Sequence, residues 1–318
     1  METILITGCA GFIGSHTAEL LLKNGFNVLG IDNFDSFYSK SLKQKNLSYL
    51  FNQNNFSFIE IDITNKNNFH QLPHNIDYVV HLAAKAGVRP SISNPNEYIN
   101  TNIIGTHHIL DWMKVSGIKK MIFASSSSVY GNNAKVPFSE SDNVDYPISP
   151  YAFTKKAGEL LNHTFHHLYN VDILNLRLFT VYGPRQRPDL AIRKFVELIK
   201  HDQPVTIYGD GLTGRDYTYV EDITHGIYNG LIYLRNNNNV FETINLGNSS
   251  PVLLSDLVTL IYQLLKKEKN ITFLPMQEGD VNLTYADIQK AKKLLNYHPA
   301  INLEEGLKRF INWYDTTI

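Results

Sequence analysis

The chain has 318 residues, 43% of them hydrophobic and 19% charged, with a formal net charge of −1 and a pI near 6.9. Such a composition suits a globular core, and its balanced charge excludes general attraction to nucleic acid, so any anion must bind at a local site. The single Cys9 cannot form an intramolecular disulfide. No apolar run approaches the roughly 20 residues of a membrane span, and no basic, apolar leader precedes the first strand-like run. We therefore expect a soluble cytoplasmic protein without membrane partners.

Short apolar runs alternate with helical stretches through about the first 175 residues. The runs are almost continuously apolar, as expected for strands that are covered on both faces of a sheet. Strand–helix alternation at this spacing predicts an α/β fold with a Rossmann-type, doubly wound parallel sheet. The expected strands are 3–7, 28–31, 56–61, 78–81, 121–124 and 171–176, and the expected helices are 15–24, 40–51, 98–116 and 150–168.

Beyond about residue 180 the pattern changes to Pro- and Gly-rich loops with short elements. Helical stretches remain near 190–201, 222–235, 255–267 and 303–314. We therefore predict a Rossmann domain over residues 1–178 and a second, smaller α/β substrate-binding domain mainly over residues 179–318. Some of the later segments are free to return to the first sheet.

A glycine-rich turn follows the first expected strand and opens the first expected helix. Its glycines, Gly8, Gly11 and Gly14, let backbone N–H groups approach a pyrophosphate, to which the helix N-terminus adds partial positive charge. Asp32 ends the second strand 18 residues later, where a carboxylate accepts hydrogen bonds from ribose hydroxyls. A 2′-phosphate would meet like charge there, and no Arg stands immediately beside Asp32, so NAD is favoured over NADP. A solvated turn residue is the structural alternative.

Further cofactor contacts are expected around this turn and at the ends of the following strands. Asp62 ends the third strand and is able to reach the adenine, although an ordinary turn explains it nearly as well. The other expected cofactor-binding residues are Phe12, Ile13, Asn33, Ile63, Leu82, Ala83, Ala84 and Asn102.

The segment 149–155 carries the strongest chemical signal. Ser149 suits an N-cap and Pro150 the first helical position, which places Tyr151 and Lys155 four residues apart on one helix face. A nearby ammonium stabilises a phenolate and lowers the pKa of a tyrosine, which makes it a general base. An isolated Tyr-x-x-x-Lys is more often a surface pair. Here it follows Ser126, which lies in a run of four serines at the end of the fifth strand, where α/β sheets place ligands.

Together these motifs resemble the extended short-chain dehydrogenase/reductase superfamily, and specifically its NAD-dependent nucleotide-sugar epimerases. The similarity covers nearly the whole chain, and several segments resemble UDP-glucuronate 4-epimerases most closely. These segments are 86–89, 179–189, and Asp32-Asn33-Phe34 with Tyr38 and Leu42-Lys43. Two further segments, 215–217 and 278–280, match the nucleotide-binding segments of the superfamily.

The resemblance implies a redox-neutral reaction. Tyr151, directly or through Ser126, takes the proton of the sugar 4-OH while NAD takes the C4 hydride; the 4-keto sugar then turns over, and the hydride returns to its opposite face. Lys155 completes the catalytic set. The resemblance also implies that Arg215 holds the diphosphate, that Tyr208 stacks on the base and that Asp280 meets its ribose. The other expected substrate-binding residues are Arg89, Ser127, Ser128, Thr180 and Arg187.

The serine run separates this chain from related enzymes. Similar sugar 4,6-dehydratases carry an Asp-Glu pair where Ser127 and Ser128 stand, and glucuronate decarboxylases carry a Glu at the position of Ser128. Gln277 departs from galactose epimerases, which have a phosphate-binding Arg there. The leading prediction is 4-epimerisation of UDP-glucuronate to UDP-galacturonate for surface polysaccharide. UDP-N-acetylglucosamine or UDP-glucose 4-epimerisation is the nearest alternative, and a net oxidoreductase or a non-enzymatic nucleotide-binding regulator represents another class.

Two further expectations concern metals and assembly. His163, His166 and His167 share a helix face without a carboxylate or cysteine to complete a zinc site, so no metal is expected. The resemblance implies a homodimer in which the helices near 98–116 and 150–168 pack against those of a second copy.

Overall fold

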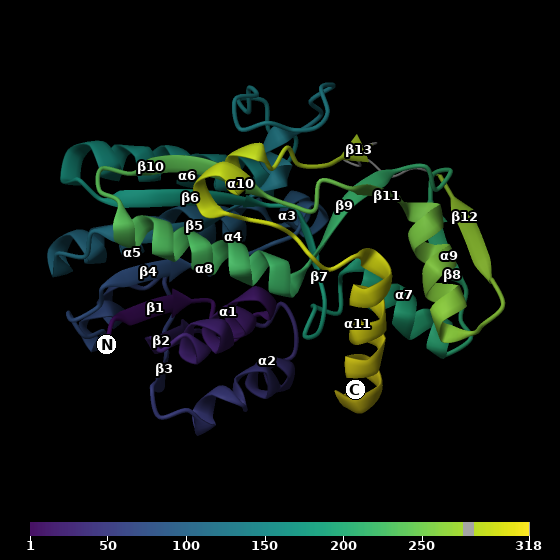
Figure 1. The fold of residues 1–318 in the computed structure, drawn as a ribbon, viewed down its shortest axis with the longest axis horizontal. Coiled ribbons are helices and arrows are strands. Elements are labelled where there is room, and N and C mark those ends of the chain that lie inside the picture. Colours follow the sequence, from purple (N-terminus) through teal and green to yellow (C-terminus); the bar gives the residue numbers. More distant parts are fainter. Residues whose placement is uncertain (276–282, 318) are drawn as a thin grey trace.

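A parallel sheet of seven strands, in the order β10-β6-β5-β4-β1-β2-β3, forms the larger lobe (Figure 1). The computed structural model describes residues 1–275 and 283–317. In this sheet the chain starts at β1, moves outward to β2 and β3, and returns to β4 on the other side of β1, which opens a crevice at the carboxyl ends of β1 and β4. The strands are β1 (Thr3–Thr7), β2 (Asn27–Asp32), β3 (Phe56–Glu60), β4 (Tyr78–His81), β5 (Lys120–Ser126), β6 (Asp172–Leu178) and β10 (Phe241–Leu246).

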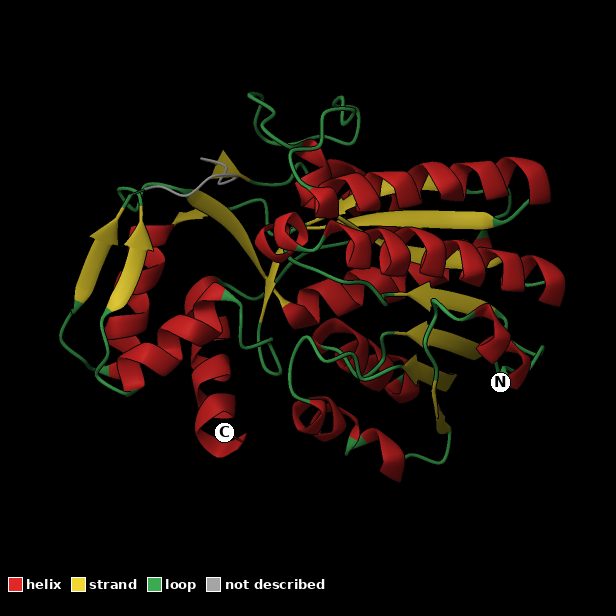
Figure 2. Cartoon of the chain, turned by 180° about the vertical axis from the view of Figure 1, so that it is seen from behind, coloured by secondary structure: helices red, strands yellow, loops and turns green. Residues whose placement is uncertain are grey.

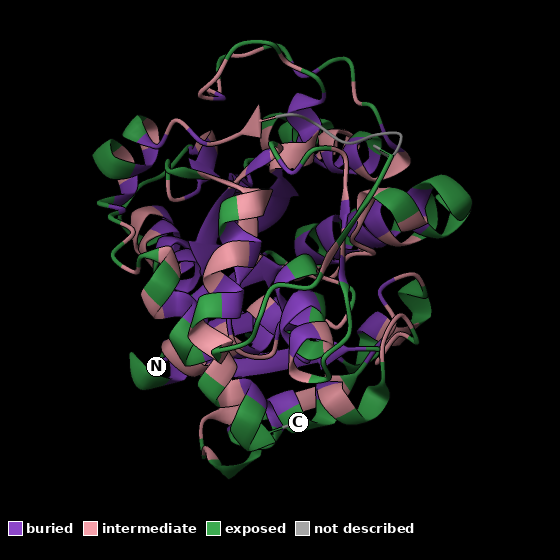
Figure 3. Cartoon of the chain, turned by 90° about the vertical axis from the view of Figure 1, so that its right-hand side faces the viewer, coloured by how far each residue is buried: buried purple, intermediate pink, exposed green. Residues whose placement is uncertain are grey.

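Helices cover both faces of this sheet, because successive strand residues point to opposite faces and both sets are apolar. In β1, Ile4 and Ile6 enter one core, while Leu5 enters the other. The first core is completed by α1 (Phe12–Lys23), α2 (Lys40–Leu47), α8 (Val220–Asn236) and α10 (Gln289–Leu295), and the second by α5 (Gly105–Ser116) and α6 (Pro150–Tyr169). Figure 3 shows the strands of the sheet buried between these helices.

The segment between β4 and α5 is more irregular than the predicted helix 98–116. It contains α3 (Val88–Ser93), α4 (Pro95–Tyr98) and the π-helix η3 (Ile99–Ile104), which runs into α5. π-helical turns are rare and often lie at functional sites. The described residues of this lobe also form three short 3₁₀ helices, η1 (Leu50–Asn52), η2 (Lys66–Gln71) and η4 (Ser127–Tyr130).

A smaller lobe with its own apolar core lies beyond the carboxyl ends of the large sheet (Figures 1 and 2). Its central strand β9 (Gly214–Tyr219) pairs with β7 (Thr180–Tyr182), β11 (Pro251–Leu253) and β13 (Leu283–Thr284). A separate parallel pair, β8 (Val205–Tyr208) with β12 (Ile271–Leu274), lies at its far end. The helices of this lobe are α7 (Ala191–Lys200), α9 (Leu254–Leu265) and α11 (Leu303–Thr317).

The predicted fold class is confirmed, and later parts of the chain do rejoin the first sheet. β10 pairs with β6 at the sheet edge, and α8 and α10 pack on the same core as α1. The boundary at residue 178 itself remains a prediction. Within residues 1–275 and 283–317, no helix is both long and apolar enough to cross a bilayer.

Candidate active site

A cavity of about 490 Å³ lies at the carboxyl ends of the central strands and reaches the smaller lobe. Residues at and after the carboxyl ends of β1 to β6 line it, together with Thr180, Arg187 and Leu190 from the start of the smaller lobe. Eighteen of the site residues expected from the sequence line this one cavity: Gly8, Gly11, Phe12, Ile13, Gly14, Asp32, Asn33, Ile63, Leu82, Ala83, Ala84, Ser126, Ser127, Ser128, Tyr151, Lys155, Thr180 and Arg187.

The glycine turn has a backbone that other residues would not permit. Gly8 has φ +71°, and a Cβ on it would lie 2.8 Å from the backbone nitrogen of Ala83. A Cβ on Gly14 would collide with the carbonyl oxygen of Gly8. The turn therefore packs tightly against the end of β4, and it leaves the N-terminus of α1 facing the cavity, as a pyrophosphate site requires.

Asp32 is buried at the end of β2 with only 8% of its surface exposed. It accepts hydrogen bonds from the backbone nitrogens of Ala10 (3.2 Å) and Phe34 (2.8 Å), and Lys43 Nζ lies 3.8 Å from Oδ1. Burial raises the pKa of Asp32, while Lys43 and the two backbone hydrogen bonds lower it. The sequence shows only that no Arg stands immediately beside Asp32. The structure adds the Lys43 ammonium from α2, whose positive charge is partly neutralised by Asp32.

Ser126, Tyr151 and Lys155 meet on one wall of the cavity. Ser126 is the last residue of β5, and α6 begins at Pro150, capped by a hydrogen bond from the Ala152 nitrogen to Ser149 Oγ (3.1 Å). The expected cap and the helix that carries Tyr151 and Lys155 are therefore present. Lys155 is buried and donates a 2.6 Å hydrogen bond to the carbonyl oxygen of Ala124.

The electrostatics of this wall differ from the expectation that Lys155 lowers the pKa of Tyr151. Burial raises the pKa of Tyr151, and a hydrogen bond with Ser126 and the charge of Arg187 act in the opposite direction. Burial lowers the pKa of Lys155 to about 8, while Glu159 raises it. In this structure the Lys155 ammonium donates to the Ala124 carbonyl, and Arg187 contributes positive charge that lowers the pKa of the Tyr151 phenol.

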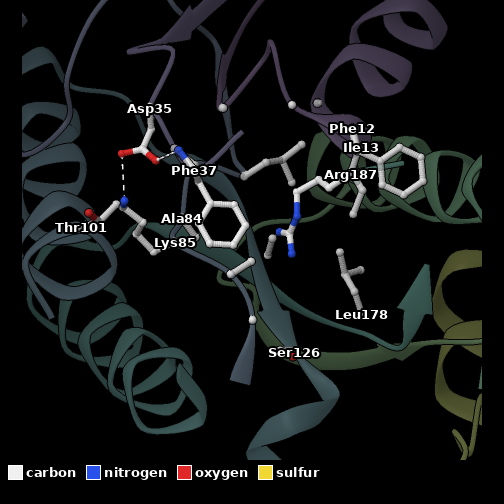
Figure 4. A pocket seen from close by; sticks show the side chains of 18 of the residues that line it. Phe12, Ile13, Asp35, Phe37, Ala84, Lys85, Thr101, Ser126, Leu178 and Arg187 are labelled. Atoms are coloured by element: carbon white, nitrogen blue, oxygen red, sulfur yellow. Dashed lines mark hydrogen bonds and ion pairs between the residues drawn. The ribbon is translucent and has the colours of Figure 1, made fainter. Parts of the chain in front are cut away.

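Arg187 brings positive charge from the smaller lobe into the cavity. Its guanidinium binds both carboxylate oxygens of Asp189 (2.9 and 2.8 Å) and lies 5.1 Å from the ring centre of Phe37. Burial works to lower its pKa, but the hydrogen bonds and charge of Asp189 raise it overall, so Arg187 stays charged. Figure 4 shows the Phe37 ring beside Arg187, and the ion pair of Lys85 with Asp35 (3.0 Å) across the same cavity.

Asn102 connects residues around the cavity and is not itself among the described residues that line it. It exchanges hydrogen bonds with the backbone of Lys85 (2.8 and 2.9 Å) and donates to Thr154 Oγ1 (2.9 Å), whose hydroxyl donates to the Tyr151 carbonyl. The π-helix thus ties the loop after β4 to the helix of Tyr151. This residue was expected to contact the cofactor directly; among the described residues, it is not part of the cavity wall.

Four other expected residues lie outside the described cavity wall. Asp62 accepts a 3.1 Å hydrogen bond from the side chain of Asn33. The Arg89 guanidinium lies 5.6 Å from the ring centre of Tyr208, which joins α3 to the smaller lobe. Arg215 lies on β9, where its Nη1 donates to the Gly214 carbonyl (2.9 Å). Asp280, like Gln277 and the rest of segment 278–280, is outside the described residues.

Several lining residues were missed by the sequence analysis. Tyr38 and Lys43 were noted only as part of the resemblance, and a side chain from α2 has no spacing signal that places it beside Asp32. Asp35, Phe37 and Lys85 had no signal at all, because they come from loops whose positions depend on the tertiary fold. No group of three or more His, Cys, Asp or Glu suited to a metal occurs in the described parts of the chain.

Comparisons with known proteins agree with this geometry. The family model for GDP-mannose 4,6 dehydratase matches residues 5–310. The chain belongs to this family. It is also 46% identical to the UDP-glucuronate 4-epimerase of Thermodesulfobacterium geofontis over 316 residues, which cover 98% of this chain and 96% of that protein. The resemblance to nucleotide-sugar epimerases is confirmed.

Solved structures of epimerases share the whole fold. The crystal structure of UDP-glucuronic acid 4-epimerase from Bacillus cereus, in complex with UDP-glucuronic acid and NAD, matches with a TM-score of 0.92 and 37% identity, covering 99% of this chain and 100% of that one. A UDP-N-acetylglucosamine 4-epimerase from Methanobrevibacter ruminantium matches with a TM-score of 0.88 and 31% identity, covering 100% of this chain and 99% of that one.

Proposed function

We propose that this member of the family catalyses the NAD-dependent 4-epimerisation of UDP-glucuronate to UDP-galacturonate. One observation carries the proposal: a single cavity contains the glycine turn with Asp32 and, on another wall, Ser126, Tyr151 and Lys155. The Bacillus cereus relative, which binds UDP-glucuronic acid and NAD, has the same fold over the full length of the chain. The Asp-Glu pair associated with 4,6-dehydration is replaced by Ser127 and Ser128.

The residues of the larger lobe fit NAD. Gly8, Gly11 and Gly14 leave a narrow cradle for its pyrophosphate, and Asp32 at the end of β2 suits the hydroxyls of its adenosine ribose. Lys155 lies on the wall that would face its nicotinamide ribose. When bound, NAD supplies a reversible hydride acceptor for C4 of the sugar.

The chain's own residues move the proton and orient the sugar. Tyr151 accepts the 4-OH proton, directly or through the hydroxyl of Ser126, and later returns it. Because burial disfavours the phenolate, the hydrogen bond with Ser126 and the charges nearby must offset that cost. Ser127, Ser128 and Thr180 provide neutral hydroxyls for the C6 carboxylate, and Arg187 adds positive charge on the opposite wall. Arg215, Tyr208, Arg89 and Asp280 are proposed to hold the UDP group.

A substrate panel tests the assignment. Purified protein would be incubated separately with UDP-glucuronate, UDP-glucose and UDP-N-acetylglucosamine, and the products resolved by NMR. We expect UDP-galacturonate from the first at a much higher kcat/KM than either neutral sugar gives. Preference for a neutral sugar would transfer the assignment to that sugar's 4-epimerase. Stoichiometric NADH production would instead indicate a net oxidoreductase.

We also propose that the protein is a cytoplasmic homodimer that provides galacturonate-type donors for polysaccharide synthesis. Apolar side chains that remain exposed on the π-helix and α6 support the dimer: Ile99 (38%), Ile104 (41%), Phe153 (46%) and Leu160 (57%). Phe153 and Leu160 are seven residues apart and so share one face of α6. A two-fold contact between these helices would bury them.

A further inference from the structure

Glu159 is a buried carboxylate on α6, one turn beyond Lys155 and two turns beyond Tyr151. Only 6% of it is exposed. Arg177 on β6, itself 3% exposed, donates from Nε to Glu159 Oε1 and from Nη2 to Oε2, both at 2.9 Å. Desolvation offsets most of the attraction within a buried ion pair, so such pairs contribute little net stability. The position of this pair directly behind the catalytic wall therefore calls for a functional explanation.

Glu159 and Lys155 hold two consecutive residues of β5. Ser125 Oγ donates a 2.6 Å hydrogen bond to Glu159 Oε1, and Lys155 Nζ donates a 2.6 Å hydrogen bond to the Ala124 carbonyl. Residues four apart lie on one helix face, so the two hydrogen bonds fix both the position of α6 along β5 and its rotation about its own axis. Ser126 is the next residue of β5, and Tyr151 lies one turn earlier on that face of α6.

Arg177 holds Glu159 from a second direction. Its guanidinium lies 4.8 Å from the ring centre of Tyr130, at the end of the 3₁₀ helix that carries Ser127 and Ser128. Tyr130 in turn donates a 2.7 Å hydrogen bond to Asn245 Oδ1 on β10. The carboxylate of Glu159 is thus braced by β5, β6 and β10 through side chains that are all buried.

We propose that Glu159, held by Arg177, is a positioning residue that sets the contact between Ser126 and Tyr151 and keeps Lys155 charged for proton transfer. The consequence for turnover rests on the proposed epimerisation, whereas the geometric part concerns the protein alone. Glu159 acts through Ser125 and Lys155. In the described part of the chain it is not among the residues that line the cavity.

The charges that face Lys155 give this role a measurable pH signature. The titratable groups that interact electrostatically with Lys155 are Glu159 on α6 and His81 on β4. Burial lowers the pKa of His81 to about 3, so this histidine is neutral at working pH. Glu159 is then the negative group that opposes the effect of burial on Lys155. Removal of its charge lets Lys155 lose its proton at a lower pH.

Two substitutions separate the charge from the hydrogen bond. Glu159→Gln keeps the side-chain length and an oxygen for Ser125 but removes the charge. We expect the alkaline limb of its kcat profile to move to lower pH by about one unit or more, with little change in KM for the UDP-sugar. Ser125→Ala keeps the charge but removes the hydrogen bond, so kcat should fall by about tenfold or more without a shift of the limb. Glu159→Asp should keep the alkaline limb of the kcat profile at its wild-type pH, and its kcat should be lower.

Asp222→Asn serves as a matched control for a structural role. Asp222 is also 6% exposed, and it accepts the backbone N–H groups of Ala300 (2.9 Å) and Ile301 (3.2 Å). This variant should lower the thermal unfolding temperature and leave the pH profile and kcat unchanged.

Crystal structures of Glu159→Gln and Ser125→Ala give a readout that needs no substrate. We expect Tyr151 to shift relative to Ser126 in Ser125→Ala. Wild-type geometry in that variant, together with an unchanged pH limb in Glu159→Gln, would overturn the proposal even in a fully active enzyme. If wild type epimerises no UDP-sugar, the proposed function fails, and the crystal structures still decide whether Glu159 positions Tyr151.

Discussion

The hydroxyl of Ser128 donates a 2.9 Å hydrogen bond to Oγ of Ser126. A residue proposed to hold the sugar's C6 carboxylate is therefore connected to the residue proposed to relay the C4 proton. This matters because a 4-keto-hexuronate is a β-keto acid. It loses CO₂ most readily when its C5–C6 bond stands perpendicular to the carbonyl plane, so the serine run must orient the carboxylate while C4 is oxidised.

The Ser127→Ala, Thr180→Ala double variant should weaken that control. Each lost hydrogen bond to a charged acceptor is worth roughly 1.5–3 kcal/mol, so KM for UDP-glucuronate should rise by at least about tenfold. Some UDP-pentose should appear among the products, as detected by NMR. UDP-glucose lacks the carboxylate and is the control substrate, for which the variant and wild type should differ little. Unchanged binding of UDP-glucuronate with no pentose would contradict this role of the hydroxyls.

Tyr151→Phe should remove the general base while the fold is retained, because only one hydroxyl is lost. General acid–base catalysis contributes about 10²–10⁴-fold, so kcat should fall by that order. Tyr146→Phe is the matched control, since Tyr146 is 81% exposed and should give wild-type turnover. Near-normal kcat in Tyr151→Phe would show that the proton takes another route.

Acid should destabilise the fold through His81. This ring is buried between Thr7 Oγ1 (2.7 Å from Nδ1) and Thr106 Oγ1 (3.0 Å from Nε2), and burial lowers its pKa from 6.5 to about 3. Between these pH values the unfolded chain binds a proton that the folded protein does not bind. The unfolding free energy therefore falls as pH drops below 6.5, by up to about 1.4 kcal/mol per pH unit for this residue.

His81→Gln should make that dependence shallower, although it lowers stability at pH 7. Urea unfolding at pH 7, 6 and 5 measures both effects. The slope will not vanish, because burial also lowers the pKa of His16 to about 3. Equal slopes for the variant and wild type would show that His81 does not carry this proton linkage.

Light scattering should give twice the 36.3 kDa chain mass at micromolar concentration. Leu160→Arg on α6 should yield the monomer, because it places a charge in the proposed interface. Leu212→Arg is the control, since Leu212 is similarly exposed (61% against 57%) but lies in the smaller lobe. A monomeric wild type would exclude the proposed dimer.

The sequence was most informative where apolar pattern and motif coincide. The six strands predicted before residue 180 all occur, because strands covered on both faces need near-continuous apolar residues. Short strands such as β7 and β13 have only three and two residues, too few for any periodicity, so the smaller sheet was not predicted. The π-helix was missed because a change in helical hydrogen bonding leaves no trace in residue spacing.

The catalytic motif was predictable because Tyr151 and Lys155 are close in sequence and belong to one helix. The supporting contacts were not. Lys43 reaches Asp32 from α2, and Arg177 reaches Glu159 from β6, which are pairings that only the folded chain creates. The pKa of Tyr151 likewise depends on burial and on Arg187 from the other lobe, neither of which the local motif contains.

The fate of the hydrogen on C4 shows whether a hydride leaves the sugar and returns to it within one active site. UDP-glucuronate deuterated at C4 would be incubated with the purified protein in ordinary water, without added nicotinamide cofactor, and the product examined by NMR and mass spectrometry. Epimerisation by hydride removal and return predicts UDP-galacturonate that keeps its deuterium at C4, with no net reduced cofactor formed. Loss of the deuterium to solvent, or turnover that requires added NAD(P)H in proportion to product, would exclude this mechanism.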